Sequence, residues 1–342
     1  MGDLWDVGRK QVEDAFSSKK FIGLLLLFLA FSLGTVYMGA NQYQDQLQDY
    51  RAGNYGADKP DFMDIFGMMM QLNMPLAAGV LAIFISYNAI SKERENETIE
   101  LLLSYPVYRD EVINGKFISG LFILALALMF SFIAGMGLAI YMVSDLPALS
   151  SIFRLSFVWL GTVVYMGCFL AIGTLLSTIF RSSWRSLGVG FVILIIFLAT
   201  PFVSGFAATQ VHPMNCDQVD SGVAHEGAVA RGLTAESDLA RAGSQGREVV
   251  TQQDSSFDQR EKCREDVQRQ RTKFREAAGK ISPPVSYRKF TATMLGTNYN
   301  ESGYPPTLME NLKSAIGYLV FLISQTALMF TASYGVFMRQ DL

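Results

Sequence analysis

Positions 90–116 carry the side chains best suited to recognising another molecule, because acidic, basic and hydroxyl groups there precede a run of leucines. The charged first half favours a helix, the leucines give that helix an apolar edge, and Pro106 ends it. Such a helix suits docking into a groove of a soluble partner, although a solvated connector without a partner fits the composition equally well. The candidate docking residues are Glu93, Arg94, Glu95, Glu97, Thr98, Glu100, Leu101, Leu102, Leu103, Pro106 and Arg109.

No set of residues predicts an active site. The Gly-Lys pairs at Gly115 and Gly279 lack the upstream glycine that a phosphate-binding loop requires. The two histidines, His212 and His225, belong to no Cys/His metal spacing and to no nucleophilic triad. We therefore expect a non-catalytic chain that itself binds no metal and no cofactor, and its net charge of −3 gives no reason to expect a nucleic-acid partner.

Apolar stretches long enough to cross a bilayer must position the docking segment. Half of the 342 residues are apolar and 17% are charged. Apart from Lys313 at the start of the last one, six long stretches contain no Asp, Glu, Lys, Arg or His, and a hydrocarbon core of about 30 Å needs about 20 helical residues. The predicted spans are residues 21–39, 65–87, 117–143, 155–180, 187–208 and 312–338.

The orientation of these spans follows from the basic residues of the short loops, which are retained on the cytoplasmic side. One side carries Arg9, Lys10, Lys19, Lys20, Lys92, Arg94, Arg109, Arg181, Arg185 and Arg339, and the other carries Arg51, Lys59 and Arg154. Both termini are thus predicted to be cytoplasmic, and residues 1–20 form an amphipathic elbow helix on the membrane surface. The fold class is an all-α integral membrane protein with six transmembrane helices in the cytoplasmic membrane.

The fifth and sixth spans enclose a polar segment, residues 209–311, which this topology makes a mostly helical extracytoplasmic domain. Residues 226–242 and 249–278 favour helices, and glycines at 243 and 246 predict a break between them. The paired prolines at 283–284 predict irregular backbone. The apolar content is too low for much of a core, so we expect this domain to pack on a second subunit or to be mobile.

Two of the three cysteines, Cys216 and Cys263, lie in this polar segment, where oxidising conditions would allow a disulfide between them. Two unpaired thiols or a metal pair are the alternatives. The third, Cys168, falls in the fourth span and is predicted to be a small buried residue.

The spans offer neutral polar groups for a transport path, namely Gln71, Asn73 and Gln325. Neutral amides in spans more often serve helix packing, which is the alternative. The lack of acidic groups and histidine at membrane depth argues against an ion-coupled carrier, because such carriers bind the driving ion there.

The docking segment resembles the type-2 permeases of ATP-binding-cassette (ABC) transporters. The matching residues are Glu93, Glu95, Thr98, Glu100, Leu102, Leu103, Pro106, Val107, Arg109, Gly115 and Lys116, and Glu97 stands where many members have Gly. The resemblance implies that residues 91–104 are the coupling helix, which fits a cleft on a separate cytoplasmic ATPase. It also implies an exporter in which ATP and Mg are bound by that ATPase, and in which two permease copies, identical or paralogous, pair in the lipid bilayer.

A second function is that of a membrane anchor that passes ATP-driven motion to an extracytoplasmic protein complex. Met63, Met68, Met69, Met70 and Met74 cluster near the outer end of the second span, and thioethers suit Cu(I). Some type-2 permeases belong to the copper-site maturation system of nitrous oxide reductase, so copper-related work is one form of this hypothesis. Methionine as adaptable apolar filling is the alternative.

Overall fold

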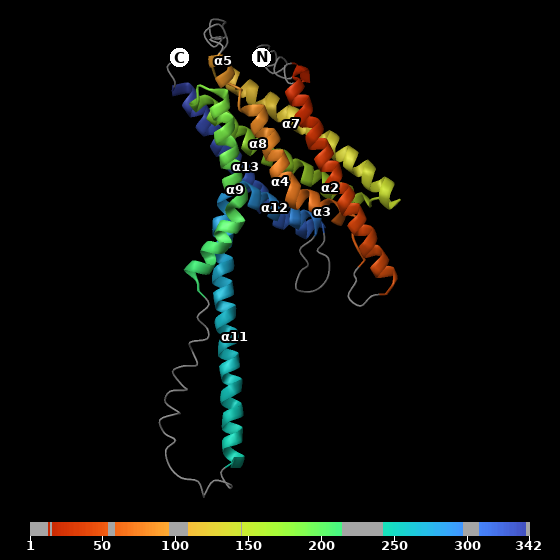
Figure 1. Cartoon of the computed structure of the whole chain (residues 1–342), viewed down its shortest axis with the longest axis vertical. Helices are drawn as coiled ribbons and strands as arrows, with labels where there is room; N and C mark the ends of the chain where they lie inside the picture. The colour runs from red at the N-terminus through yellow and green to blue at the C-terminus, as the bar shows by residue number, and fades with distance from the viewer. Residues whose placement is uncertain are drawn as a thin grey trace. The chain divides into compact units, whose positions relative to one another are not determined.

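The computed structural model describes residues 13, 16–53, 59–95, 109–144, 146–213, 242–296 and 308–339. Within these ranges the side chains of residues 72, 93, 109, 242–260, 276, 308 and 310 are not described. Every regular element in the described ranges is a helix (Figure 1). Most of the predicted elbow helix lies outside these ranges, and the first long helix, α2, begins at Lys19.

The chain forms two compact units, residues 1–198 with 282–342 and residues 199–281. The first unit holds α2 (Lys19–Arg51), α3 (Asp64–Met68), the π-helix η1 (Met69–Asn73), α4 (Met74–Ser86), α5 (Ser91–Glu95), α7 (Arg109–Val143), α8 (Leu149–Ile179), α12 (Pro283–Leu295), α13 (Leu308–Arg339) and the start of α9 (Ser183–Val211). The second unit holds the end of α9 and α11 (Ala242–Ile281).

Five helices are long and apolar enough to cross a membrane: α2, α7, α8, α9 and α13. The predicted second span is not one straight helix, because the axes of the helical segments before and after residues 72–73 form an angle of 50° with each other. Pro75 at the start of α4 has no N–H to donate, and the π-turn of η1 precedes it. A sixth crossing requires that this bent pair be counted as one span.

Helix α8 is the most buried of the five apolar helices, with 72% of its most apolar stretch inside the protein, against 11% for α13. It contacts α4, α7, α12 and α13. Small residues allow these close approaches, and at Gly161 the ring of Phe290 from α12 occupies the space that a Cβ would need. The predicted burial of Cys168 is confirmed, since its side chain is 1% exposed on α8.

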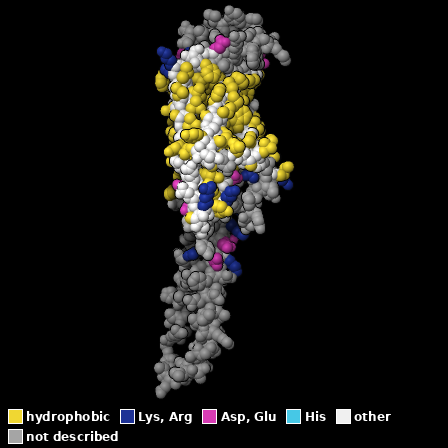
Figure 2. Space-filling view, turned by 90° about the vertical axis from the view of Figure 1, so that its right-hand side faces the viewer, with side chains coloured by type: hydrophobic (Ala, Val, Ile, Leu, Met, Phe, Trp, Pro, Cys, Tyr) yellow, Lys and Arg dark blue, Asp and Glu magenta, His cyan; other side chains and the backbone are white. Residues whose placement is uncertain are grey.

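The face that α2 and α7 form at the right of Figure 1 carries a continuous band of hydrophobic side chains (Figure 2). Leu26, Leu27 and Phe31 of α2 and Phe122 and Ile133 of α7 are all exposed. The charged side chains drawn in Figure 2 lie beyond the edges of this band. An exposed apolar surface of this kind needs lipid or another apolar partner around it.

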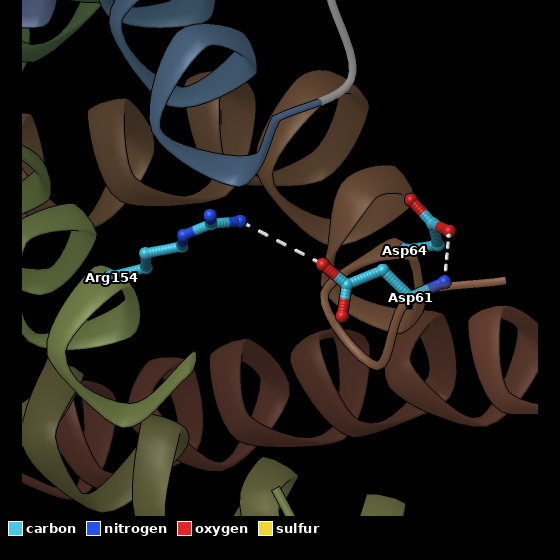
Figure 3. A network of polar contacts seen from close by, with 3 residues as sticks. All are labelled: Asp61, Asp64 and Arg154. Carbon is cyan, nitrogen blue, oxygen red and sulfur yellow. Dashed lines mark hydrogen bonds and ion pairs between the residues drawn. The ribbon is translucent and has the colours of Figure 1, made fainter. Parts of the chain in front are cut away.

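An ion pair links the start of α8 to the segment before α3 (Figure 3). The Nη1 atom of Arg154 lies 3.7 Å from Oδ2 of Asp61, three residues before the start of α3. The backbone N–H of Asp61 donates to Oδ2 of Asp64 at 2.9 Å, so the turn before α3 is fixed as well. These contacts connect the bent second span to α8.

Two predictions for the polar segment are wrong. Residues 243–246 do not break the helix, because α11 runs through them from Ala242 to Ile281; an isolated glycine lowers helix stability by only about 1 kcal/mol. The paired prolines do not make residues 283–287 irregular, because they occupy the first turn of α12, where no N–H is required. Helix α12 belongs to the first unit and the second unit spans residues 199–281, while the extracytoplasmic placement of residues 209–311 stays a prediction.

The approach of α2 to α3 gives a testable prediction. A Cβ on Gly39 would overlap the backbone carbonyl of Ile65, whereas a Cβ on Gly34 of the same helix would meet nothing within 4 Å. We expect Gly39→Ala to lower the free energy of unfolding by about 1–3 kcal/mol, the range for an overpacked site. Thermal unfolding in detergent would measure this, with Gly34→Ala as the matched control. Equal melting temperatures for the two variants would contradict the described packing.

Candidate functional site

The candidate site is the beginning of the predicted docking segment, residues 90–95, which we call the root segment. It comprises Ile90 and helix α5 (Ser91–Glu95). The remaining docking candidates Glu97, Thr98, Glu100, Leu101, Leu102, Leu103 and Pro106 lie outside the described residues, and the side chains of Glu93 and Arg109 are not described. The root segment therefore shows how the docking segment is attached to the membrane helices.

The hydroxyl group of Ser177, near the end of α8, forms the buried part of this attachment. Its Oγ accepts hydrogen bonds from the backbone N–H groups of Ile90 at 2.9 Å and Ser91 at 3.0 Å. The first N–H groups of a helix have no partner inside the helix, and a hydroxyl from α8 satisfies them here. Ser91 and Ser177 are both fully buried, so this contact is shielded from water.

The carboxylate of Glu95 holds the start of α9. Its Oε1 accepts a hydrogen bond from the backbone N–H of Ser183 at 3.0 Å, and its Oε2 accepts one from the Ser183 hydroxyl at 2.7 Å. A carboxylate at a helix N-terminus is favoured by the helix dipole and by the unpaired N–H groups there. These hydrogen bonds from the Ser183 hydroxyl and backbone lower the pKa of Glu95 from its ordinary value of 4.5.

Three further contacts complete the attachment. The Nη1 atom of Arg94 donates to the carbonyl of Thr178 at 3.1 Å, and the Ser91 hydroxyl lies 3.2 Å from those of Ser177 and Ser183. All the partners fall between Ser177 and Ser183, the junction between α8 and α9. A displacement of the root segment is therefore passed to the ends of two long apolar helices.

Helices α7 and α13 also contact the chain at the beginning of the root segment. The Nζ atom of Lys116 on α7 donates to the carbonyl of Ala89, and Lys116 is only 9% exposed. Ile90 packs with Ile113 of α7 and Phe337 of α13 in a small separate apolar cluster. The sequence did not identify Ser177 and Ser183 as parts of the attachment. Only the Gly115-Lys116 pair pointed to Lys116.

The three amides that were candidates for a transport path lie apart from the root segment. Gln71 Nε2 donates to the carbonyl of Arg288 on α12 at 3.3 Å, which is a packing contact. Asn73 is half-buried at the end of η1, and Gln325 lies on α13. The described contacts do not bring these residues together, so a path along them stays a prediction.

The predicted disulfide and the methionine cluster are described only in part. Cys263 on α11 is disulfide-bonded, but Cys216 lies outside the described residues, so the pairing of these two cysteines stays a prediction. Met63, Met69, Met70 and Met74 are at most 1% exposed, and the Met70 sulfur accepts a hydrogen bond from Tyr287 at 3.3 Å. In the ranges that the structure describes, no group of three His, Cys, Asp or Glu residues is arranged to hold a metal. Burial of the cluster favours methionine as apolar filling.

In the part of the chain that the structure describes, the five long apolar helices are those of a multi-span membrane protein. The chain belongs to the ABC-2 family of transporter proteins, whose model matches residues 5–342. It is thus the membrane permease component of an ABC transporter, and the family implies an ATPase partner.

Two relatives agree with this assignment, and both are described as a probable ABC transporter permease protein NosY. The relative from Stutzerimonas stutzeri is 29% identical over 133 residues, which cover 39% of this chain and 44% of that protein. The relative from Pseudomonas aeruginosa is 29% identical over 192 residues, which cover 55% of this chain and 63% of that protein. The aligned regions thus span less than two thirds of either relative.

The buried acceptor at Ser177 gives a second prediction. Ser177→Ala removes the partner of two buried N–H groups, and leaving such groups unsatisfied costs about 1–3 kcal/mol. We expect a lower melting temperature and faster hydrogen exchange at the amides of Ile90 and Ser91. Ser156→Ala is the control, because the hydroxyl of Ser156 is exposed and bonds only within α8. Unchanged exchange at Ile90 and Ser91 would contradict the attachment.

The lowered pKa of Glu95 gives a third prediction. Because its pKa in the folded protein is depressed, the carboxylate contact is fully present above the ordinary value of 4.5 and is lost as the pH falls through the lowered pKa. Glu95→Gln should accelerate hydrogen exchange at the Ser183 amide at neutral pH. The native chain should approach the variant only below pH 4.5.

The control for this measurement is Glu261→Gln, since Glu261 is exposed on α11 and remote in sequence from the root segment. It should leave exchange at Ser183 unchanged at every pH. Equal exchange at Ser183 in the native chain and in Glu95→Gln at neutral pH would show that the carboxylate does not hold α9.

Proposed function

We propose that this permease is the membrane subunit of an ATP-driven exporter, and that its separate ATPase docks on residues 91–104. The observation that carries the proposal is the attachment of the root segment to the α8–α9 junction through Ser177, Thr178 and Ser183. A docking helix transmits force only when its base is fixed to the elements that must move. The buried hydroxyl, the guanidinium and the carboxylate supply that fixed base.

The working cycle follows from this linkage. ATP and Mg bind to the partner ATPases, whose closure carries the docking segments of two permease copies with them. Because the root segment is bonded to the junction, the ends of α8 and α9 follow, and the paired permeases alternate between inward-open and outward-open arrangements. Rigid-body transmission of this kind needs no ionisable group inside the membrane.

The proposed orientation places both termini, the root segment and the ATPase on the cytoplasmic side. It is supported by the basic residues near the root segment, Lys92, Arg94, Arg181 and Arg185, since short loops rich in Lys and Arg stay inside. In this orientation α11 is extracytoplasmic, and the elbow helix before α2 lies on the inner membrane surface.

A second candidate function is a membrane anchor that uses ATP-driven motion to act on an extracytoplasmic complex, including one for copper-site maturation. The observation that favours it is α11, a 40-residue helix. Its half-buried residues Cys263, Val267, Arg271, Phe274 and Ala278 follow a helical stripe, while most other side chains described on it are exposed. A long exposed polar helix suits contact with a protein partner more than a transport path.

The docking proposal gives a fourth prediction. Reversing two charges of the docking segment with Glu97→Lys and Glu100→Lys should weaken ATPase binding about tenfold, since repulsive charges at an interface act against association. ATPase co-purification and ATP turnover in proteoliposomes would measure the effect. The control is Glu261→Lys with Glu265→Lys, which reverses two exposed charges on α11.

Three outcomes distinguish the two candidate functions. Loss of ATPase recovery only in the Glu97/Glu100 variant supports docking on residues 91–104. Full recovery with normal turnover in that variant would contradict it. An extracytoplasmic protein that is lost with Glu261/Glu265, while ATPase recovery stays intact, would favour the second candidate function.

A further inference from the structure

A pocket of about 480 Å³ opens in the first unit beside the root segment. Its lining includes Ser18, Lys19 and Lys20 at the start of α2, Lys92 and Glu95 of the root segment, and Trp184 at the start of α9. None of the contacts described above fills this pocket. We propose that it binds the phosphate headgroup of an anionic phospholipid from the inner leaflet.

The charge of the pocket favours an anion. Among the described residues that line the pocket, Lys19, Lys20 and Lys92 are basic and Glu95 is the one acidic residue. Both oxygens of that carboxylate already accept hydrogen bonds from Ser183. Within the described ranges no carboxylate pairs with any of the three lysines, so their positive charge remains available for a phosphate.

The start of α2 adds hydrogen-bond donors to this charge. The side chain of Ser18 forms no capping hydrogen bond, and the first turn of α2 contains no acidic residue. The first N–H groups of a helix have no partner inside the helix and carry its positive dipole end. The start of α9 differs, because the Glu95 carboxylate already occupies it. The pocket therefore combines three basic side chains with the start of a helix whose first turn contains no acidic residue.

The surroundings of the pocket favour a lipid over a soluble anion. The apolar run of α2 begins at Phe21, directly after the two lysines, and Trp184 is 76% exposed at the start of α9. Basic residues and exposed tryptophan at the ends of spans are typical of the membrane interface. Exposed apolar side chains follow on both helices, among them Leu26 and Leu27 on α2 and Ile195 and Ile196 on α9. The acyl chains of a lipid would cover these apolar side chains, whereas free phosphate would leave them exposed.

A bound headgroup would connect α2, the root segment and the start of α9. Basic pockets between membrane helices on the cytoplasmic side are suited to anionic lipid headgroups. Only the assignment to the inner leaflet rests on the proposed topology; the chemistry of the pocket does not depend on ATPase docking.

Lipid retention by the full-length chain tests the proposal. The protein would be reconstituted in phosphatidylcholine nanodiscs with and without phosphatidylglycerol, re-extracted, and the retained lipid measured by mass spectrometry. We expect selective retention of phosphatidylglycerol and a higher melting temperature in its presence. Each basic residue near an anionic surface contributes about fivefold to binding, so Lys19→Gln, Lys20→Gln and Lys92→Gln together should weaken retention about a hundredfold.

The matched control is Lys59→Gln with Lys313→Gln, which removes two exposed lysines at the opposite ends of spans. Equal loss of phosphatidylglycerol in the control would show a general charge effect and overturn the site. Stabilisation by soluble glycerophosphate as strong as that by phosphatidylglycerol would show that free phosphates are the ligand. Loss of ATPase recovery with unchanged lipid retention in the lysine variant would assign the pocket to the ATPase.

A fluorescence measurement keeps the test valid if the lysine variant does not fold. Bromine on lipid acyl chains quenches the fluorescence of nearby tryptophan. Brominated phosphatidylglycerol should therefore quench the part of the emission that comes from Trp184, which is the part that Trp184→Phe lacks. Brominated phosphatidylcholine should quench that part much less. The chain has three tryptophans, so the difference between the native chain and Trp184→Phe isolates this position. Equal quenching by the two brominated lipids would overturn the proposal.

Discussion

The root segment is bonded to the α8–α9 junction by the buried Ser177 hydroxyl and by the exposed Glu95 carboxylate, and the transmission of force to the membrane helices depends on this attachment. Without it, a charged loop leaving the bilayer would move independently of the helices. With it, a force on the docking segment reaches α8, the most buried of the five apolar helices. Because α8 contacts α4, α7, α12 and α13, these four helices must accommodate any displacement of α8.

A nonpolar surrounding explains how the interior of the first unit is built. Buried polar groups near the bend are paired with one another, because lipid offers no partner for an unsatisfied donor or acceptor. The Tyr165 hydroxyl donates to the carbonyl of Pro75 at 2.6 Å, next to the bend of the second span. Tyr287 stacks on Tyr165 with ring centroids 4.6 Å apart and lies 3.0 Å from the Thr162 hydroxyl. Helix α12 thus supports the bend from the side, and the bend needs no charged residue.

The sequence predicted the apolar helices because hydropathy and length report directly on bilayer crossing. The bend was missed because hydropathy alone treats residues 65–87 as one apolar run; Pro75 was a sign of a bend, whereas nothing in the sequence marks the π-turn of η1 before it. The paired prolines of α12 were misjudged, since the same residues either break a helix or begin one, according to whether the preceding turn packs. Acidic residues identified the docking segment, but Ser177 and Ser183 are common small residues more than eighty positions away. Only the folded chain brings them to the root segment.

Spin labels in the assembled permease and ATPase complex would test the central claim most directly. Lys92→Cys and Arg185→Cys place one label on the root segment and one at the start of α9, both at exposed positions, with Cys168 replaced by Ala. The account predicts a single narrow distance distribution that is the same without nucleotide and in the ATP-trapped state, because the two segments move as one body. A distribution that broadens or shifts on ATP binding would show that the root segment moves independently of the helices, and would contradict the account.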